Sequence, residues 1–285
     1  MRPVCSLAFV AFVTVGLIPA FGCIQGRFIN DIPALRPAKI DLSSRFSSHV
    51  DVKIDGTETK ILIPTAEERA EALSKQTVAA YEAKLPGTAT SEEMNDYAAS
   101  LIFLKRPAEA IPILVALEKK IPGLYATAAN LGTAYELVGD VPNALVWIRA
   151  GVARNPQSHR GTEWLHLAIL VTKRTLQTDA NWLATHSVLD AEAPRSAEET
   201  VRAIEYQLNE RLHFVGPSDP IICDLFYQAA VRLNDPALQG RRNDYLQQSL
   251  RFGDLRKTLI DRLDVHEIEA AGLNARKIIP GLEGK

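Results

Sequence analysis

The sequence predicts a mainly α-helical protein, a solenoid of packed helical hairpins preceded by a small β-hairpin. Three observations support this fold class. One stretch of the chain repeats itself after 34 residues, several apolar runs follow helix-start signals, and one short segment alternates apolar and polar residues. A fixed period of this length is the signature of a repeat architecture, in which each unit buries its apolar face against the next one.

The first 22 residues resemble an export signal. Arg2 is followed by the uncharged, mostly apolar run Val4–Phe21, and Ala20 and Gly22 are the small residues that a signal cleavage site requires. Cys23 follows directly, as in bacterial lipoprotein signals. This resemblance implies lipidation of Cys23, which would then be the new N-terminus.

Two alternatives to lipidation stay open. The run could remain as a membrane anchor, although 18 residues is short for a bilayer span, or the chain could be cleaved and freely secreted. We expect a bacterial envelope location, membrane-anchored and facing the periplasm or the exterior.

The segment after Cys23 predicts a tether and then a β-hairpin. Residues 23–48 contain Pro33 and Pro37, which break regular structure. Val50–Ile54 alternates apolar and polar residues, Asp-Gly at 55–56 is a turn pair, and Ile61–Ile63 completes the hairpin over 49–64.

The next segment predicts a helix and the first repeat. Thr65 and Glu68 form a capping box that opens a helix to about Leu85, where Pro86-Gly87 ends it. A repeat unit then begins near Ser91, with Glu92 and Glu93 favourably placed in the first helical turn.

Two units of the repeat can be aligned residue by residue, Ser91–Leu124 with Tyr125–Ser158. The small or apolar pairs are Ala98 with Gly132, Leu101 with Tyr135, Ala110 with Ala144, Leu114 with Ile148, and Pro122 with Pro156. The small residues let the two helices of a unit approach closely, the larger ones fill the space between helices, and each proline ends its unit. Gly139-Asp140 suits the turn between the helices of the second unit.

The second unit resembles the tetratricopeptide (TPR) family. It reads Leu131-Gly132-x-x-Tyr135, followed by Ala144, Ile148, Gly151 and Pro156. The first unit departs from the family pattern, with Tyr97-Ala98 and Leu101 where the family prefers Leu-Gly and Tyr. The resemblance implies a solenoid that binds protein partners and performs no chemistry.

The resemblance also implies a concave groove lined by the first helix of each unit. Carried over by repeat position, the lining is Asn95, Ala99, Ile102, Ala129, Thr133, Glu136, Glu163 and Leu167. The matched positions of the first two units hold no Lys or Arg, so we do not expect the family's grip on a C-terminal carboxylate. The lining suits an amphipathic helix of a partner. Alternatively, the chain's own helix 65–85 or its C-terminal helices fill the groove.

The rest of the chain predicts less regular helical hairpins. Residues 162–174 resemble the first half of a third unit, and residues 175–195 are predicted to be a loop insertion in which Trp182 and Leu183 pack inward. Ser196 and Glu199 cap a helix to about Phe214. The predicted divisions are 1–22 signal, 23–48 tether, 49–64 hairpin, 65–90 N-terminal helix, 91–174 repeats, 175–195 insertion, 196–263 C-terminal hairpins, and 264–285 tail.

Charge and cysteine content exclude some classes of function. The formal net charge is −2 with no basic stripe, so we expect no nucleic-acid partner. Of the three cysteines, Cys5 lies in the signal segment and Cys23 at its end. Cys223 then has no partner for a disulfide, and its apolar surroundings favour a small core residue.

No motif predicts a catalytic, cofactor or metal site. The six histidines show no close metal-ligand spacing, although His159 and His166 lie seven residues apart on roughly one helix face. We therefore expect a non-enzymatic interaction or scaffold module without cofactors or metals. Its partners would be an unidentified protein or peptide and, through the anchor, the membrane. The alternatives are a self-associating envelope subunit that pairs through its hairpin, and an enzyme using Asp179, His186 and Asp190.

Overall fold

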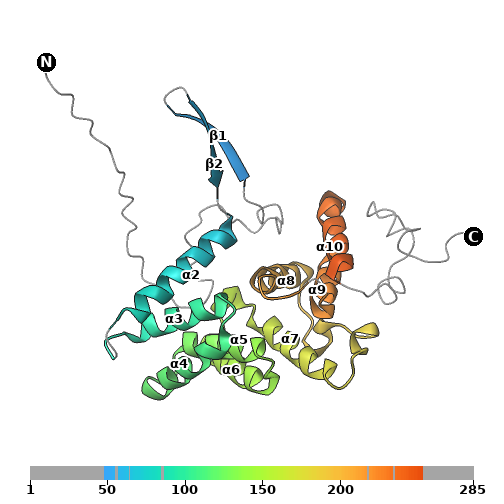
Figure 1. Ribbon diagram of the computed structural model, residues 1–285. Helices are drawn as coiled ribbons and strands as arrows, with labels where there is room; N and C mark the ends of the chain where they lie inside the picture. Colours follow the sequence, from blue (N-terminus) through green and yellow to red (C-terminus); the bar gives the residue numbers. More distant parts are fainter. Residues whose placement is uncertain are drawn as a thin grey trace, which may run out of the picture.

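The computed structural model describes residues 48–54, 57–63, 65–84, 87–216, 218–233 and 235–252. The predicted signal segment, Cys23, the tether up to residue 47, the end of the predicted C-terminal hairpins from residue 253 and the tail 264–285 all lie outside these ranges. Within them the protein is mainly helical, and consecutive helices pack against one another as hairpins (Figure 1). The prediction of a mainly helical protein built from packed helical hairpins is therefore confirmed.

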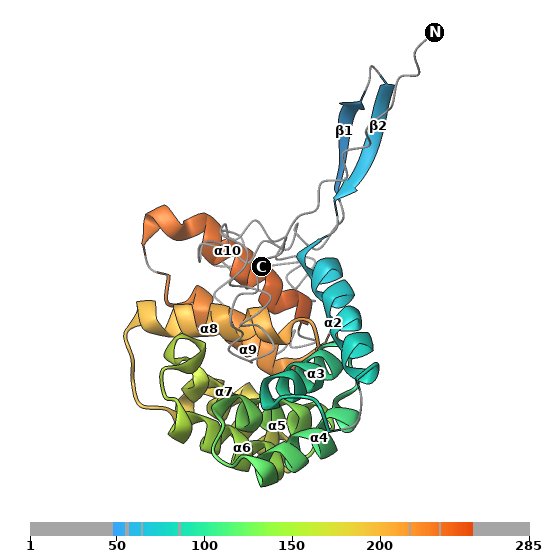
Figure 2. The same cartoon turned by 90° about the vertical axis from the view of Figure 1, so that its left-hand side faces the viewer.

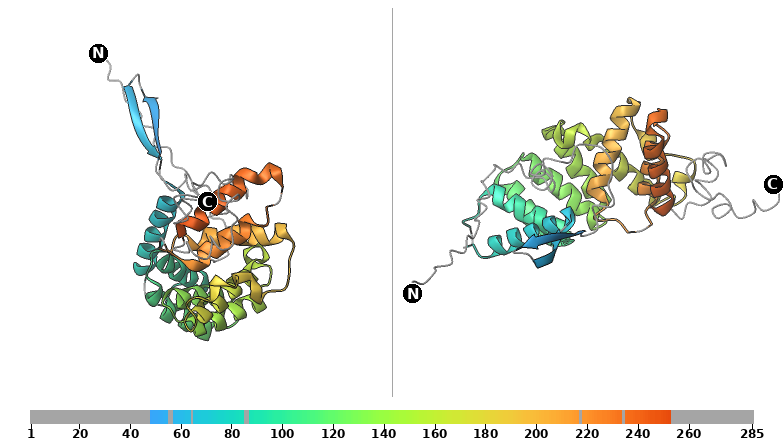
Figure 3. Two further views of the ribbon diagram at one scale, coloured as in Figure 1. Left: turned by 90° about the vertical axis from the view of Figure 1, so that its right-hand side faces the viewer. Right: turned by 90° about the horizontal axis from the view of Figure 1, so that it is seen from above.

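Nine helices lie in the described part of the chain. In order they are α2 (Ala66–Glu82), α3 (Ser91–Phe103), α4 (Pro107–Lys120), α5 (Tyr125–Leu137), α6 (Val141–Arg154), α7 (Glu163–Leu176), α8 (Ala197–Arg211), α9 (Pro220–Ala230) and α10 (Gln239–Phe252). Helices α2 to α7 follow one another along a curve, and α8 to α10 complete the body beside its inner side (Figure 2). The view from above separates the α2–α6 end of the body from the α8–α10 end (Figure 3).

The period of the sequence reappears in the positions of the helices. Helices α3 and α5 start 34 residues apart, at Ser91 and Tyr125. Helices α4 and α6 start at Pro107 and Val141, which is the same separation. The two aligned segments therefore fold into two successive helical hairpins of equal length.

Side-chain caps fix the starts of several helices. Thr65 and Glu68 form the predicted capping box of α2, and Thr90 with Glu93 forms a second one at α3. Ser196 caps α8 through the backbone N–H of Glu199, as predicted. These contacts satisfy backbone donors that have no partner inside the helix.

Equivalent turns join the helices of the two units. Gly139 adopts φ +85° between α5 and α6, and Lys105, 34 residues earlier, adopts φ +61° between α3 and α4. In both turns a backbone N–H reaches back five residues, from Asp140 to Tyr135 and from Arg106 to Leu101. The left-handed conformation is easy for glycine but strained for lysine.

Small residues set the spacing between paired helices. A Cβ atom at Gly132 would lie 3.1 Å from the backbone nitrogen of Ile148 and closer still to that side chain. At the equivalent positions of the two units, Ala98, Ala110 and Ala144 have no exposed surface. The predicted close approach of the two helices of a unit is therefore present in the structure.

A second core lies under α7 to α10. Phe226 and Ile204 are fully buried there, and Leu183 packs into the same cluster, with Trp182 partly buried against it. The 175–195 segment contains two short 3₁₀ helices, Trp182–Ala184 and Val188–Ala191, rather than open loop. Buried Asp224 holds this segment, because its carboxylate accepts from the Ser187 hydroxyl and the Val188 N–H.

Cys223 is a buried residue of this second core, as the sequence predicted. Its sulfur lies 3.4 Å from the Ser249 hydroxyl of α10. Helices α9 and α10 pack together as the predicted hairpin.

Two extended segments precede the helices. Strands β1 (Ser48–Ile54) and β2 (Thr57–Ile63) pair antiparallel, with Val52 opposite Thr59. A lone two-stranded hairpin is marginally stable in water. The helices alone define the fold class.

The equivalent turns give the first testable prediction. Gly139→Ala should lower the free energy of unfolding by about 1 kcal/mol, because alanine must adopt the left-handed conformation, while no atom lies within 4 Å of the added Cβ. Lys105→Gly should not lower it, since relief of strain offsets the greater freedom of glycine in the unfolded chain. Urea unfolding of both variants measures this. Equal destabilisation by the two changes would contradict the equivalence of the turns.

Candidate functional site

The predicted groove residues of α3 are not on an open surface. Asn95 is buried and exchanges side-chain hydrogen bonds with Thr127 of α5. Ala99 is buried, and Ile102 has no exposed surface and packs in the cluster that includes Val78 of α2. These three positions therefore hold helices together in this structure.

The remaining predicted groove residues divide into two groups. Ala129, Thr133 and Glu136 of α5 line a cavity of about 310 Å³. Glu163 of α7 is buried next to that cavity and bonds two histidines. Leu167 instead packs with the cluster between α6 and α7.

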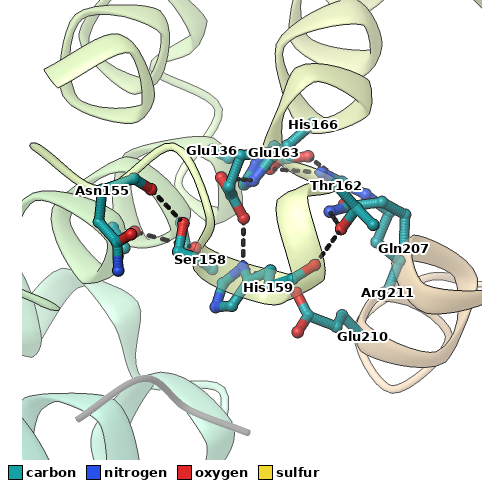
Figure 4. Close-up of polar contacts among 12 residues, drawn as sticks. Glu136, Asn155, Ser158, His159, Thr162, Glu163, His166, Gln207, Glu210 and Arg211 are labelled. Carbon is teal, nitrogen blue, oxygen red and sulfur yellow. Dashed lines mark hydrogen bonds and ion pairs between the residues drawn. The ribbon is translucent and has the colours of Figure 1, made fainter. Parts of the chain in front are cut away.

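The cavity lies where the repeats meet α8 and the residues after it. Its lining comes from α3, α5, α7 and α8, from the turn before α7, and from the segment that leads to α9. The residues are Phe103, Ala129, Asn130, Thr133, Glu136, Leu137, His159, His166, Lys173, Gln207, Glu210, Arg211, His213, Phe214, Val215, Gly216 and Asp219. Figure 4 shows six polar residues of this lining close together: Glu136, His159, His166, Gln207, Glu210 and Arg211.

A buried carboxylate, Glu136, is the centre of the site. Its oxygens accept from Arg211 at 2.5 Å, from Lys173 at 2.7 Å and from the Nε2–H of His166 at 2.8 Å. Burial alone would raise the pKa of Glu136, but the charges of Arg211 and Lys173, together with the His166 hydrogen bond, hold it well below its usual range. Glu136 is therefore ionised in the folded protein at neutral pH.

Glu163 forms a second buried centre with two histidines. The Nδ1–H of His159 donates to one oxygen, and Nδ1 of His166 lies 3.4 Å from the other. Burial opposes ionisation of Glu163, yet the hydrogen bonds from His159 and His166 lower its pKa far below the usual range. Burial and Arg211 would lower the pKa of His166, but Glu136 and Glu163 outweigh them and raise it.

Glu210 of α8 behaves in the opposite way. Burial raises the pKa of this carboxyl group and outweighs His159, whose Nδ1 lies 3.9 Å from it, and the hydrogen bond from Tyr206. A carboxyl group so weakly compensated takes up a proton more readily than Glu136 or Glu163.

The end of α8 is held against the repeats by further contacts. The Nε2 of His213 lies 2.7 Å from the carbonyl oxygen of Phe103, and its Nδ1 lies 2.7 Å from the Glu67 carboxylate. Phe214 packs against the cluster of α2 to α5. The chain's own C-terminal part thus covers this side of the repeats, one of the two alternatives that the sequence left open.

The residues of the enzyme alternative serve separate local roles. Asp179 accepts from the backbone N–H of Asn181. His186 stacks on Trp182, and Asp190 accepts from the N–H of Ser187 in a capping box. Nothing in these contacts brings the three side chains to a common point.

The described residues contain neither a candidate metal site nor a candidate membrane-spanning helix. No group of three or more His, Cys, Asp or Glu side chains there could hold a metal ion. Among the helices that the structure describes, none is both long enough and apolar enough to cross a bilayer.

Sequence reasoning identified only part of this site. Glu136 and Glu163 were predicted from repeat position, whereas Arg211, Lys173 and Glu210 come from elements with no such alignment. The spacing of four residues between His159 and Glu163 could have predicted that these two side chains contact each other. The sequence does not reveal this contact, because His159 lies before α7 rather than within it. His159 and Arg160 adopt left-handed backbone conformations there, with φ +47° and +57°.

Comparisons with known proteins assign neither a family nor a function to the chain. No family model matches the chain, and a search of curated proteins finds no match. The interpretation of the site therefore depends on its own geometry.

The buried carboxylates predict a loss of stability in acid. The folded-state pKa values of Glu136 and Glu163 are depressed, so their contribution is present above the unfolded-state pKa near 4.3 and is lost as pH falls through the folded values. Glu136→Gln should lower the free energy of unfolding by about 3 kcal/mol at pH 7, because it leaves Arg211 and Lys173 without their carboxylate. The variant should also show a smaller decrease between about pH 5 and pH 3.

Urea unfolding at several pH values measures both effects. Glu198→Gln is the control, because the Glu198 side chain is 82% exposed and should alter neither the stability nor the slope. An unchanged pH slope in Glu136→Gln would mean that Glu136 does not contribute to the acid sensitivity.

Proposed function

We propose that the chain is a non-enzymatic partner-binding module built on a TPR-type solenoid. The observation that supports it best is the 34-residue separation between the starts of α3 and α5, and again between α4 and α6. Units of this kind present extended surfaces and bind partners by shape and side-chain complementarity.

Contacts between successive units support the same interpretation. The guanidinium of Arg154 in α6 donates to both oxygens of Glu118 in α4, and it also donates to the carbonyl of Leu124. Asn95 and Thr127 join α3 to α5. Each hairpin is thus attached to its neighbour by specific polar contacts as well as by apolar packing.

The side of the repeats next to the cavity is the proposed contact surface. Thr133 of α5 is half-buried there and makes only a local side-chain hydrogen bond, to the carbonyl of Ala129. The proposed partner is a protein of the bacterial envelope. The resemblance of residues 1–23 to a bacterial lipoprotein signal supports this location, and the tether would hold the helical body away from the membrane.

Anchoring through Cys23 is part of this proposal. The intact mass of the membrane-extracted chain tests it. A mass that begins at Cys23 and includes acyl groups, and that is lost in Cys23→Ala, supports anchoring by lipidation. An unlipidated full-length mass supports a retained membrane anchor, and an unlipidated mass beginning near Cys23 supports free export.

Self-association through the hairpin is the second candidate. Strands β1 and β2 form a two-stranded sheet, and both of its edges carry main-chain groups that another chain could pair with. Light scattering of the exported body with and without residues 24–64 distinguishes this candidate from partner binding, since only self-association predicts a change in mass.

The contact surface gives a prediction for partner binding. Thr133→Arg should reduce the yield of crosslinked envelope protein at least about tenfold, equivalent to 1.4 kcal/mol, because a long charged side chain would fill the approach to the cavity. Thr178→Arg, the same change at an exposed position after α7, should leave the yield unchanged. Crosslinking in native membranes followed by mass spectrometry measures the yield. Equal yields for both folded variants would exclude this surface.

A further inference from the structure

Two histidines join the early helices of the body to the later ones. His166 of α7 contacts Glu136 of α5 as well as Glu163 of its own helix. His213, which follows α8, contacts both α2 and α3. The hydrogen bonds of these two rings therefore help to decide how firmly α7 and the end of α8 are held against α2, α3 and α5.

Both ring nitrogens of His166 face carboxylate oxygens. Nε2 lies 2.8 Å from the Glu136 carboxylate, and Nδ1 lies 3.4 Å from the Glu163 carboxylate (Figure 4). An ionised carboxylate only accepts hydrogen bonds, and a neutral imidazole has a single N–H. Only the imidazolium form can donate to both groups, because the neutral ring would direct a lone pair at one of them.

His213 has the same kind of surroundings. Its Nδ1 lies 2.7 Å from the Glu67 carboxylate, and its Nε2 lies 2.7 Å from the backbone carbonyl oxygen of Phe103. Both oxygens are acceptors, so two hydrogen bonds again require two ring protons. The ring also stacks on the Phe103 ring, with centroids 4.2 Å apart, and the face of an aromatic ring attracts a cation.

Several charged groups act on these two rings. Burial and Arg211 lower the pKa of His166, but the hydrogen bonds and charges of Glu136 and Glu163 outweigh them and raise it. The other titratable or charged groups around the two histidines are His159 before α7, Lys173 of α7, Glu210 of α8, and Glu67 and Glu71 of α2.

We propose that His166 and His213 form a pH-sensitive latch, which holds α7 and the end of α8 against α2, α3 and α5 while both rings carry two protons. Loss of one proton from either ring removes one of its two hydrogen bonds, and the end of α8 then opens more often. Arg211 keeps its charge and its contact with Glu136. Opening is therefore local and does not require the body to unfold.

The direction of the pH effect follows from the raised pKa of His166. The stabilisation that the protonated ring supplies is fully present below the unfolded-state pKa near 6.5, and it is lost as pH rises through the folded-state value. The buried carboxylates destabilise the fold in acid, so the latch adds a second limit on the alkaline side.

Opening of the latch would change access to the cavity. Phe103, His166, His213 and Phe214 all contribute to its lining. Phe103 is only 9% exposed while His213 stacks on it. Withdrawal of His213 would uncover this aromatic ring and widen the cavity on the side of α3.

Hydrogen–deuterium exchange of the full-length protein at about pH 6 and about pH 8.5 tests the latch, because a histidine loses its second proton between these values. The exchange rate of peptides over 205–216 is divided by the intrinsic rate at each pH. The corrected rate should rise at least about threefold at the higher pH, because proton loss favours the open form. Peptides over α4, which contacts neither histidine, should not change.

Matched variants assign the response to the two rings. The double variant His166→Gln with His213→Gln should show the same corrected rate at both pH values, because glutamine does not ionise in this range. His186→Gln is the control, since the exposed His186 stacks on Trp182, away from the latch, and should keep the full response.

Three results would overturn the proposal. These are an unchanged corrected rate in the unchanged protein, a full pH response in the double variant, or loss of the response in His186→Gln. If the double variant does not fold, the single variants decide, since each should show a smaller response than the unchanged protein. The test requires no partner, so its outcome is separate from that of the crosslinking experiment.

Discussion

The folded arrangement depends on one buried negative charge. Glu136 lies on the inner side of α5 and is held by Lys173 of α7, His166 of α7 and Arg211 of α8. A carboxylate at this depth is tolerable only when cations and hydrogen bonds compensate it. Because Arg211 must compensate this charge, the last turn of α8 is held against the repeats. His213 and Phe214, which come next in the chain, contact the same side of the repeats.

The cavity adjoins this arrangement. Its lining combines Glu136 and the side chains that contact it with Leu137 and Phe214, which pack against the apolar cluster of α2 to α5, and with Val215, which packs against the cluster of α7 to α10. Among the residues that line the cavity, one polar atom each of Asn130, Glu210 and Arg211 is buried without a hydrogen-bond partner in the described part of the chain. The surface that the repeat alignment predicts to be an open groove is thus partly covered by α8 and the residues after it, and a cavity remains there.

Much of the helical body could be predicted from the sequence, because its signals are local. The 34-residue alignment anticipated α3 to α6, and cap residues such as Ser196 marked helix starts. The site could not be predicted in full, because Arg211 lies 75 residues from Glu136 and belongs to no aligned unit. Repeat position also placed Asn95 and Ile102 in a groove, where the structure has α2 and neighbouring helices packed around α3.

The measurement that tests this account most directly is a double-mutant cycle between Glu136 and Arg211. The free energy of unfolding is measured for Glu136→Gln, for Arg211→Met and for the double variant, at pH 7. The account predicts a coupling of at least about 1.5 kcal/mol, because each single change leaves the other group buried without its partner. Additivity within about 0.3 kcal/mol would contradict it, and would mean that apolar packing alone holds α8 against the repeats.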